Sequence, residues 1–297
     1  MSVQNPPKVS APSLRAMKAA GERIAVLTAY DFPTARILDD SGIDVLLVGD
    51  SLGMVVLGHA STIPVTMEDM LHHTKAVARA ARRALVVGDM PYLSFHLSVE
   101  ESVRNAARFL KEAGAGGVKI EGASAGRLKL VEALVEAEVP VMGHVGLTPQ
   151  SICGLGAYKV QGTTLEAARR IIAGARDLER AGAFAVVLES VPMEIALEVT
   201  SRLEIPTIGI GAGPHCDGQV LVFHDMAGYA TGYLPKFVRK YADLDSVIGD
   251  AVRRYAADVR KGTFPDDETS YHLKPTEARR ILGALGRPRA RRTQGAR

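Results

Sequence analysis

Four acidic residues stand where short apolar runs end, and a buried strand does not usually end on a charge. They are Asp50 in "VLLVGD", Asp89 in "VVGD", Glu121 in "GVKIEG" and Glu189 in "VVLES". Carboxylates gathered in one place repel each other, and their pKa values rise unless a cation lies among them. A hard divalent cation is the simplest such cation, and Mg²⁺ typically takes one or two carboxylates together with water and substrate. The pattern therefore predicts a magnesium site.

Three further polar residues occur beside these acids. Lys119 precedes Glu121 by two residues and shares its face of the strand; it is either a salt-bridge partner inside the fold or a contact for a substrate carboxylate. His144 in "MGHVG" is either a satisfied polar residue or part of an active site. Ser51 either caps the next turn, or its hydroxyl and N–H hold an anion.

Eight short apolar runs are predicted to be the strands that position these residues. They are nearly continuous rather than alternating, which is typical of parallel strands buried on both faces. The runs are Ile24–Ala29, Val45–Val48, Leu85–Val87, Gly117–Ile120, Pro140–Gly143, Phe184–Leu188, Pro206–Ile210 and Gln219–Phe223. Helical stretches lie between them, and three have the spacing of a capping box: Thr66-x-x-Asp69, Ser98-x-x-Glu101 and Thr163-x-x-Glu166.

Repeated strand–helix units predict an α/β fold, a single-domain (β/α)8 TIM barrel, with a doubly wound open sheet as the alternative. Barrel enzymes build their sites where the strands end, so all four acids are expected on one face. Asp50, Asp89 and Glu121 come from neighbouring strands and are the predicted metal ligands. Glu189 comes from across the barrel and is free to act as a base. The glycine-rich turn Gly209–Pro214 either binds phosphate or is only a tight turn.

The predicted domain limits place a disordered lead at 1–13, the barrel at 14–272 and an extension with a basic disordered tail at 273–297. A short helix over Leu14–Ala20 is expected before the first strand, and a late helix over Leu244–Lys261 is expected to pack outside the barrel.

The net charge of +3 comes from the chain's last twelve residues, which hold five arginines. The rest of the chain carries 31 basic and 33 acidic side chains, a net of −2, which does not indicate a nucleic-acid partner. No apolar run is long enough to span a membrane and no export signal is seen. The two cysteines, Cys153 and Cys216, form no metal or disulfide pattern, so a reducing cytoplasm is expected.

The residue chemistry suits a 2-oxo acid, bound through its oxo and carboxylate groups. Mg²⁺ would polarise the oxo group and stabilise the enolate left when a base removes a proton from the neighbouring carbon. Carbon–carbon bond formation or cleavage is the reaction class that follows.

Several long segments, found in order, resemble the ketopantoate hydroxymethyltransferase family. They are "LTAYDFPTARILDDSGIDVLLVGDSLGMVVLGH", "STIPVT", "GGVKIEG", "VMGHVGLTPQS", "FAVVLESVP" and "IPTIGIGAGPHCDGQVLVFHDMAG". The resemblance covers about Leu14 to His272. It implies a barrel enzyme that moves a one-carbon unit from 5,10-methylenetetrahydrofolate to 3-methyl-2-oxobutanoate in pantothenate synthesis.

Residue roles also follow from the resemblance. It implies that Asp50, Asp89 and Glu121 hold Mg²⁺, and that Glu189 takes the proton from C3. The oxo-acid contacts that it implies are Asp50, Ser51, Asp89 and Lys119. His144 resembles the active-site histidine of the family, and members assemble as homodecamers.

Two competing interpretations remain at this level. A lyase of the isocitrate lyase and phosphoenolpyruvate mutase type would also use a barrel, a metal and a 2-oxo acid. Such lyases carry a cysteine in a Lys-Lys-Cys-Gly-His loop, whereas Cys153 lies in "SICGLG". A non-catalytic barrel used for binding would have no need of a free Glu189 opposite a metal site.

Overall fold

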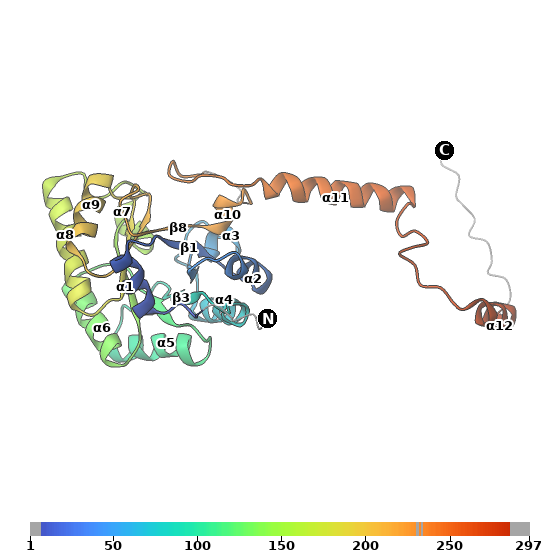
Figure 1. Cartoon of the computed structure of the whole chain (residues 1–297), viewed down its shortest axis with the longest axis horizontal. Helices are drawn as coiled ribbons and strands as arrows, with labels where there is room; N and C mark the ends of the chain where they lie inside the picture. Colours follow the sequence, from blue (N-terminus) through green and yellow to red (C-terminus); the bar gives the residue numbers. More distant parts are fainter. Residues whose placement is uncertain (1–6, 230–231, 233, 286–297) are drawn as a thin grey trace. The chain divides into compact units, whose positions relative to one another are not determined.

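The computed structural model describes residues 7–229, 232 and 234–285. Its strands form a closed barrel: all neighbours are parallel, the order follows the chain, and β8 pairs with β1 (Figure 1). The strands are β1 (Ile24–Thr28), β2 (Val45–Val48), β3 (Leu85–Asp89), β4 (Gly117–Lys119), β5 (Val141–Gly146), β6 (Ala185–Glu189), β7 (Thr207–Ile210) and β8 (Gly218–Leu221). The predicted barrel is confirmed, and the open-sheet alternative is wrong because closure pairs the two edge strands.

Helices alternate with these strands around the barrel, as Figure 1 shows. They are α1 (Ala11–Ala20), α2 (Phe32–Asp40), α3 (Leu52–Val55), α4 (Met67–Ala80), α5 (Val99–Lys111), α6 (Ala125–Glu136), α7 (Ile152–Leu155), α8 (Leu165–Arg180), α9 (Met193–Arg202) and α10 (Phe223–Met226). A 3₁₀ turn, η1 (Pro149–Ser151), precedes α7. Their apolar faces pack on the outward-facing residues of the strands in one large buried cluster.

The N-termini of three helices can be compared with the predicted capping boxes. Thr66 and Asp69 form a complete box at α4, in which each side chain accepts a hydrogen bond from the other residue's backbone N–H. Ser98 caps α5 by accepting from the N–H of Glu101. The box predicted at Thr163 is wrong by one residue, because Thr164 is the N-cap of α8.

A second apolar cluster fills the barrel interior, and the segment before β1 closes its N-terminal end. Alternate strand residues such as Val26, Val45 and Val187 point inward and contact one another, and Val9 and Leu14 belong to the same cluster. The predicted disordered lead over 1–13 is therefore too long. Burial of Val9 orders the chain before Leu14, and α1 already begins at Ala11.

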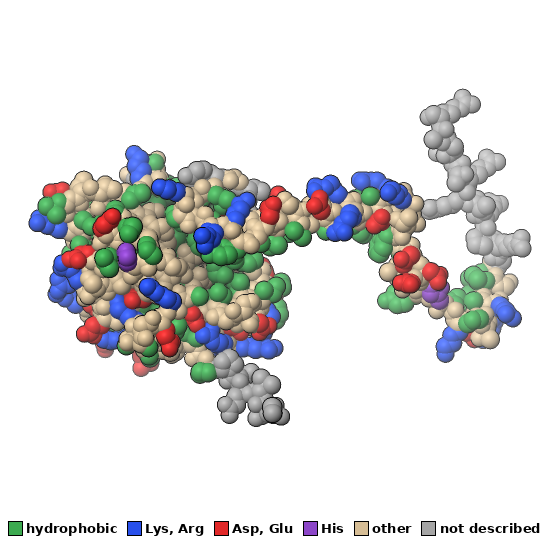
Figure 2. Space-filling model, turned by 45° about the horizontal axis from the view of Figure 1, so that its top comes forward, with side chains coloured by type: hydrophobic (Ala, Val, Ile, Leu, Met, Phe, Trp, Pro, Cys, Tyr) green, Lys and Arg blue, Asp and Glu red, His purple; other side chains and the backbone are tan. Residues whose placement is uncertain are grey.

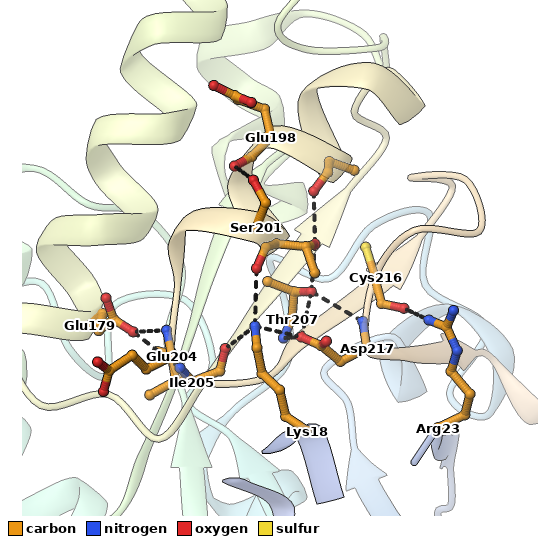
Figure 3. A network of polar contacts seen from close by, with 12 residues as sticks. Lys18, Arg23, Glu179, Glu198, Ser201, Glu204, Ile205, Thr207, Cys216 and Asp217 are labelled. Atoms are coloured by element: carbon orange, nitrogen blue, oxygen red, sulfur yellow. Dashed lines mark hydrogen bonds and ion pairs between the residues drawn. The ribbon is translucent and has the colours of Figure 1, made fainter. Parts of the chain in front are cut away.

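Lys18 fastens α1 to the strand ends at this side of the barrel (Figure 3). Its Nζ lies 2.9 Å from Oδ2 of Asp217 and donates to the carbonyl oxygens of Thr200 and Ile205 at 3.1 and 3.0 Å. The same Asp217 oxygen accepts from the N–H of Thr207 at 2.8 Å. This network lies at the N-terminal ends of the strands, whereas the acids lie at the C-terminal ends.

The barrel flank beside β1 and β8 is hollowed. The four-residue α10 follows β8, and a groove of about 900 Å³ lies against the two strands, lined by apolar residues that include Leu27, Val220 and Phe237. On the face seen in Figure 2, basic and acidic side chains of the barrel unit are interspersed.

Internal contacts divide the chain after Asp243 into a barrel unit and a second unit. The second unit contains α11 (Leu244–Lys261), with the predicted bounds, and α12 (Pro275–Leu285). That α11 packs on the barrel stays a prediction, and the predicted domain limit at 272 lies inside the second unit. The arginine-rich end, 286–297, and residues 1–6 lie outside the described residues. No helix in the described part of the chain is long and apolar enough to cross a membrane.

Candidate active site

The polar site continues the inward-facing rows of the barrel strands. In β3, Leu85 and Val87 belong to the inner cluster, and Asp89 follows at the same two-residue spacing. In β6, Val187 precedes Glu189 in the same way. Alternate residues of a strand share a face. Asp89 and Glu189 therefore point inward like the apolar residues before them, and they lie at the C-terminal end of the barrel interior.

Lys119, at the end of β4, forms a buried ion pair with Asp89 of the neighbouring strand. Its Nζ lies 2.5 Å from Oδ1 of Asp89, and the two side chains are 6% and 4% exposed. Burial alone would lower the pKa of Lys119, but the charges of Asp89, Glu121 and Asp50 outweigh burial and raise it. Lys119 is therefore a cation among the acids. Both of its predicted roles, salt-bridge partner and contact for a substrate carboxylate, require this charge.

Asp50 lies two residues beyond the last residue of β2 and next to Asp89. Its backbone N–H donates to Oδ2 of Asp89 at 3.2 Å. Burial, and then the negative charge of Asp89, raise the pKa of Asp50 to about 7. The protein therefore holds a carboxyl group that a nearby cation would readily ionise at neutral pH.

Glu121 follows β4, two residues beyond Lys119, and its charge acts on Lys119. Its Oε2 accepts a hydrogen bond from the N–H of Gln150 at 3.1 Å, and its backbone carbonyl accepts from Nε of Arg127. Burial raises the pKa of Glu121 well above its usual value, Lys119 opposes this rise, and Asp50 and Asp89 add to it.

His144, on β5, lies between the carboxylates of two other strands. Its Nδ1 is 3.6 Å from Oε1 of Glu121, and its Nε2 is 3.4 Å from Oε2 of Glu189. The ring is 1% exposed, and neither nitrogen makes a hydrogen bond with the described atoms. The interpretation of His144 as an ordinary satisfied polar residue therefore does not fit, since buried polar atoms are normally paired.

Ser51 does not cap the helix that follows it. The N-terminus of α3 has no side-chain hydrogen bond from Ser51, and Oγ of Ser51 instead lies 2.8 Å from the hydroxyl of Tyr30. Tyr30 is itself buried, and His73 contacts its carbonyl oxygen at 2.6 Å. The capping interpretation is wrong, and the Ser51 hydroxyl is held beside Asp50 by a tyrosine from the end of β1.

The glycine-rich turn after β7 is closely packed. Gly213 has a positive φ of 75°, and a Cβ there would come within 2.4 Å of the Cβ of Met193. The glycine is therefore required by the turn and its neighbour, which favours the tight-turn interpretation.

The donor set can be compared with the needs of a magnesium ion. Among the described residues, no three His, Cys, Asp or Glu side chains converge into a ready-made ligand cluster. Mg²⁺ keeps several waters and takes one or two carboxylates directly, so such a cluster is not required. Buried oxygens of Asp50, Asp89 and Glu121, together with unpaired buried atoms of Gln150 and His144, fit a hydrated cation.

Contacts, in part through Gln150, thus link six of the seven predicted site residues, and the seventh, Ser51, follows Asp50 directly in the chain. Two contributors were not predicted, Tyr30 and Gln150. Gln150 lies in the "GLTPQS" segment after the fifth strand. Its position just beyond a strand end is the sequence feature that could have identified it as a site residue. Tyr30 likewise lies just beyond the end of the first strand.

Comparison with known proteins gives a consistent result. The family model described as ketopantoate hydroxymethyltransferase matches residues 8–267. A 3-methyl-2-oxobutanoate hydroxymethyltransferase of Thermoanaerobacter sp. (strain X514) is 56% identical over 270 residues, covering 91% of this chain and 98% of the relative. The enzyme of that name from Carboxydothermus hydrogenoformans (strain ATCC BAA-161 / DSM 6008 / Z-2901) is 53% identical over 275 residues, covering 92% and 99%.

The fold also resembles solved structures. One is 2,3-dimethylmalate lyase, a member of the PEP mutase/isocitrate lyase superfamily, with a TM-score of 0.58 and 18% identity over 93% of this chain and 95% of that one. At this identity the likeness concerns the fold alone.

Proposed function

The chain belongs to the ketopantoate hydroxymethyltransferase family, and we propose that it converts 3-methyl-2-oxobutanoate into ketopantoate. The one-carbon unit comes from 5,10-methylenetetrahydrofolate, and water supplies the hydroxyl oxygen. The carbon added to C3 completes the ketopantoate skeleton for pantothenate and coenzyme A synthesis. The observation that carries the proposal is the buried set of Asp50, Asp89 and Glu121 around Lys119, with Glu189 beyond His144.

Asp50, Asp89 and Glu121 would hold the metal ion. Bound magnesium supplies Lewis-acid polarisation of the oxo group, which makes the hydrogen on C3 more acidic and stabilises the enolate. These side chains are buried and mutually repulsive. Burial and the neighbouring acids raise the pKa values of Asp50 and Glu121, and a cation bound among them would lower those pKa values. The match of burial, charge and oxygen donors supports Mg²⁺ as the cofactor.

Lys119 is the group best suited to the substrate carboxylate. It is the cation that the described acids surround, and its ammonium group has three donors, of which Asp89 takes one. The Ser51 hydroxyl, which Tyr30 holds next to Asp50 in the chain, would supply a second polar contact. An oxo acid would thus be bound by its carboxylate while its oxo oxygen faces the acids.

Glu189 is the proposed base. Its side chain is 18% exposed, whereas those of Asp89 and Glu121 are 4% and 5% exposed, so that substrate can reach Glu189. Water adds to the methylene carbon of the folate and both of its C–N bonds break, which releases tetrahydrofolate and leaves this carbon at the oxidation level of formaldehyde. The C3 proton passes to Glu189, the electron pair forms the new bond to this carbon, and its oxygen takes up a proton to become the hydroxyl group. His144 lies in position to orient Glu189 and to share its proton.

The lyase alternative has less support. The likeness to 2,3-dimethylmalate lyase concerns the fold, whereas the relatives above 50% identity carry the hydroxymethyltransferase name. Assembly as a homodecamer and residence in the cytoplasm stay predictions; the first rests on the family and the second on the two unpaired cysteines.

Turnover by the purified full chain tests the function. We expect ketopantoate, detected by mass spectrometry, only when 3-methyl-2-oxobutanoate, methylenetetrahydrofolate and Mg²⁺ are all present. Loss of product with excess EDTA and its return with Mg²⁺ would support the metal. Cleavage of 2,3-dimethylmalate without formation of ketopantoate would instead favour a lyase.

A further inference from the structure

Gln150 is buried in the loop that follows β5, and the proposed reaction gives it no role. It is 4% exposed and lies in η1, directly after Pro149. Buried glutamine is uncommon because its amide has four hydrogen-bonding positions to satisfy. The partners of this amide therefore show what the residue does.

The side chain and backbone of Gln150 contact the ends of three strands. Nε2 donates to Oδ2 of Asp50 at 2.9 Å and to the carbonyl oxygen of Met90 at 3.0 Å. The backbone N–H donates to Oε2 of Glu121 at 3.1 Å. One residue therefore holds two of the three proposed metal-binding carboxylates and the chain just after the third.

The orientation of the amide is fixed by these acceptors. Nε2 faces the carboxyl group of Asp50 and the carbonyl group of Met90; the carbonyl, and the carboxyl group once it is ionised, can only accept a hydrogen bond. A flipped amide would bring Oε1 against both oxygens and lose both bonds. Gln150 thus donates both of its amide hydrogens through Nε2.

The loop that carries Gln150 is anchored to β6. Gly146 has a φ of 98°, and a Cβ there would come within 2.3 Å of the carbonyl oxygen of Glu189. The N–H of Leu147 donates to that same oxygen at 2.8 Å. The turn out of β5 is therefore set by the strand that carries the proposed base, and the start of the loop is held in place.

Oε1 of Gln150 is buried and makes no hydrogen bond with the described atoms. A buried acceptor without a donor is unfavourable, and in functional sites it often marks the place of a water or ion. Water molecules on a magnesium ion are strong donors, so this oxygen suits a water of a hydrated ion.

We propose that Gln150 is a positioning residue, which holds the carboxylates of Asp50 and Glu121 in the arrangement that binds the metal ion. The inference rests on the proposed magnesium site. Residues that hydrogen-bond to metal ligands typically contribute 10- to 100-fold to metal affinity. Loss of the Gln150 amide is expected to have an effect of that order.

The test is titration of Mg²⁺ into metal-free full-length protein by calorimetry. Gln150→Met keeps the length and burial of the side chain but removes both donors. We expect its Kd for Mg²⁺ to rise roughly 10- to 100-fold. Gln219→Met is the matched control, because the Gln219 amide donates to the carbonyl of Gly213 and not to a site carboxylate; its Kd should match wild type.

Kinetics separate positioning from a general structural defect. The Mg²⁺ concentration that gives half-maximal rate should rise in Gln150→Met by the same factor as Kd, while the KM for the folate stays unchanged. A merely structural loss would lower the rate at every Mg²⁺ concentration. If Gln150→Met does not fold, Gln150→Asn takes its place, since its shorter side chain cannot reach both Asp50 and Met90.

Unchanged Mg²⁺ affinity in the folded Gln150 variant, with normal binding in wild type, would overturn this inference and leave the proposed function intact. Absence of Mg²⁺ binding in wild type would overturn the metal site and this inference together.

Discussion

Nε2 of His144 lies 3.4 Å from Oε2 of Glu189, while Nδ1 of the same ring lies 3.6 Å from Oε1 of Glu121. One buried imidazole therefore connects the proposed base with a proposed metal-site carboxylate. A neutral imidazole can donate to one of them only, and a protonated ring can donate to both. His144 is thus placed to respond when Glu189 takes a proton.

Glu189→Gln should abolish proton removal without abolishing binding. The amide keeps size and hydrogen bonding but lacks basicity. In heavy water with Mg²⁺, wild type should exchange the C3 hydrogen of 3-methyl-2-oxobutanoate for deuterium, and the variant should lose exchange and turnover by on the order of 10²-fold or more. Proton NMR follows the exchange. Exchange at the full rate in Glu189→Gln would move the role of base to His144, and His144→Asn would be measured next.

Asp50→Asn and Asp89→Asn should each weaken Mg²⁺ binding and turnover together. Each substitution removes a charged oxygen and leaves the shape nearly unchanged. Calorimetry gives the affinity, and Asp177→Asn on the outer face of α8 is the control. If both site variants bind Mg²⁺ as wild type does, the metal lies elsewhere.

Lys119→Met should raise the KM for 3-methyl-2-oxobutanoate much more than the KM for methylenetetrahydrofolate. A lost charge-assisted hydrogen bond is worth about 1.5–3 kcal/mol, or roughly 10- to 100-fold in KM. Steady-state kinetics with each substrate varied in turn measure the two values, and Lys129→Met, exposed on α6, is the control. Equal increases in both KM values would argue that the Asp89 ion pair is only structural.

The metal-free protein should lose stability as pH rises from about 4 to about 7. Asp50 has an ordinary pKa of 3.8 when unfolded and a pKa of about 7 when folded. In that window the native state holds a proton that the unfolded state has released, so the free energy of unfolding falls with rising pH. The upper limit for this one group is on the order of 4 kcal/mol. Urea unfolding in EDTA at pH 5.5 and 7.5 measures the slope.

The slope should become shallower in Asp50→Asn, which has no proton to release there. Saturating Mg²⁺ should also reduce it in wild type, because the cation stabilises the ionised form. A wild type that gains stability over this pH range, with the same slope in the variant, would contradict the raised pKa of Asp50.

Lys18→Met should destabilise the barrel from its other end. Lys18 is mostly buried, and its loss removes the positive charge beside Asp217 and takes this donor from the carbonyl oxygens of Thr200 and Ile205. We expect a loss of about 1–3 kcal/mol, the usual cost of an unsatisfied buried group. Arg15→Met is the matched control on the same helix, because the Arg15–Glu204 pair is exposed and should contribute about 0–1 kcal/mol. Equal stability of both variants by urea unfolding would show that the Lys18 network contributes little.

The strands and the acids at their ends were predictable because both are properties of short segments. A continuous apolar run is buried on both faces, and its alternate residues share a side, so Asp89 and Glu189 had to follow the inward rows of their strands. The cap of α8 was misplaced by one residue, because Thr163 and Thr164 both have a hydroxyl and local spacing alone does not choose between them.

The sequence by itself determined the barrel, the end of it that carries the charges, and the residue types of the site. Tertiary structure alone decided which of these groups meet. Lys119 pairs with Asp89 rather than with another of its neighbouring acids, Val9 is buried although it precedes the predicted domain, and Gln150 reaches Asp50 across 100 residues of sequence. Such partners depend on the closure of the barrel and on the path of the loops over its end. Barrel closure and loop path produce no periodic pattern in the sequence, because each of these contacts joins residues from separate parts of the chain.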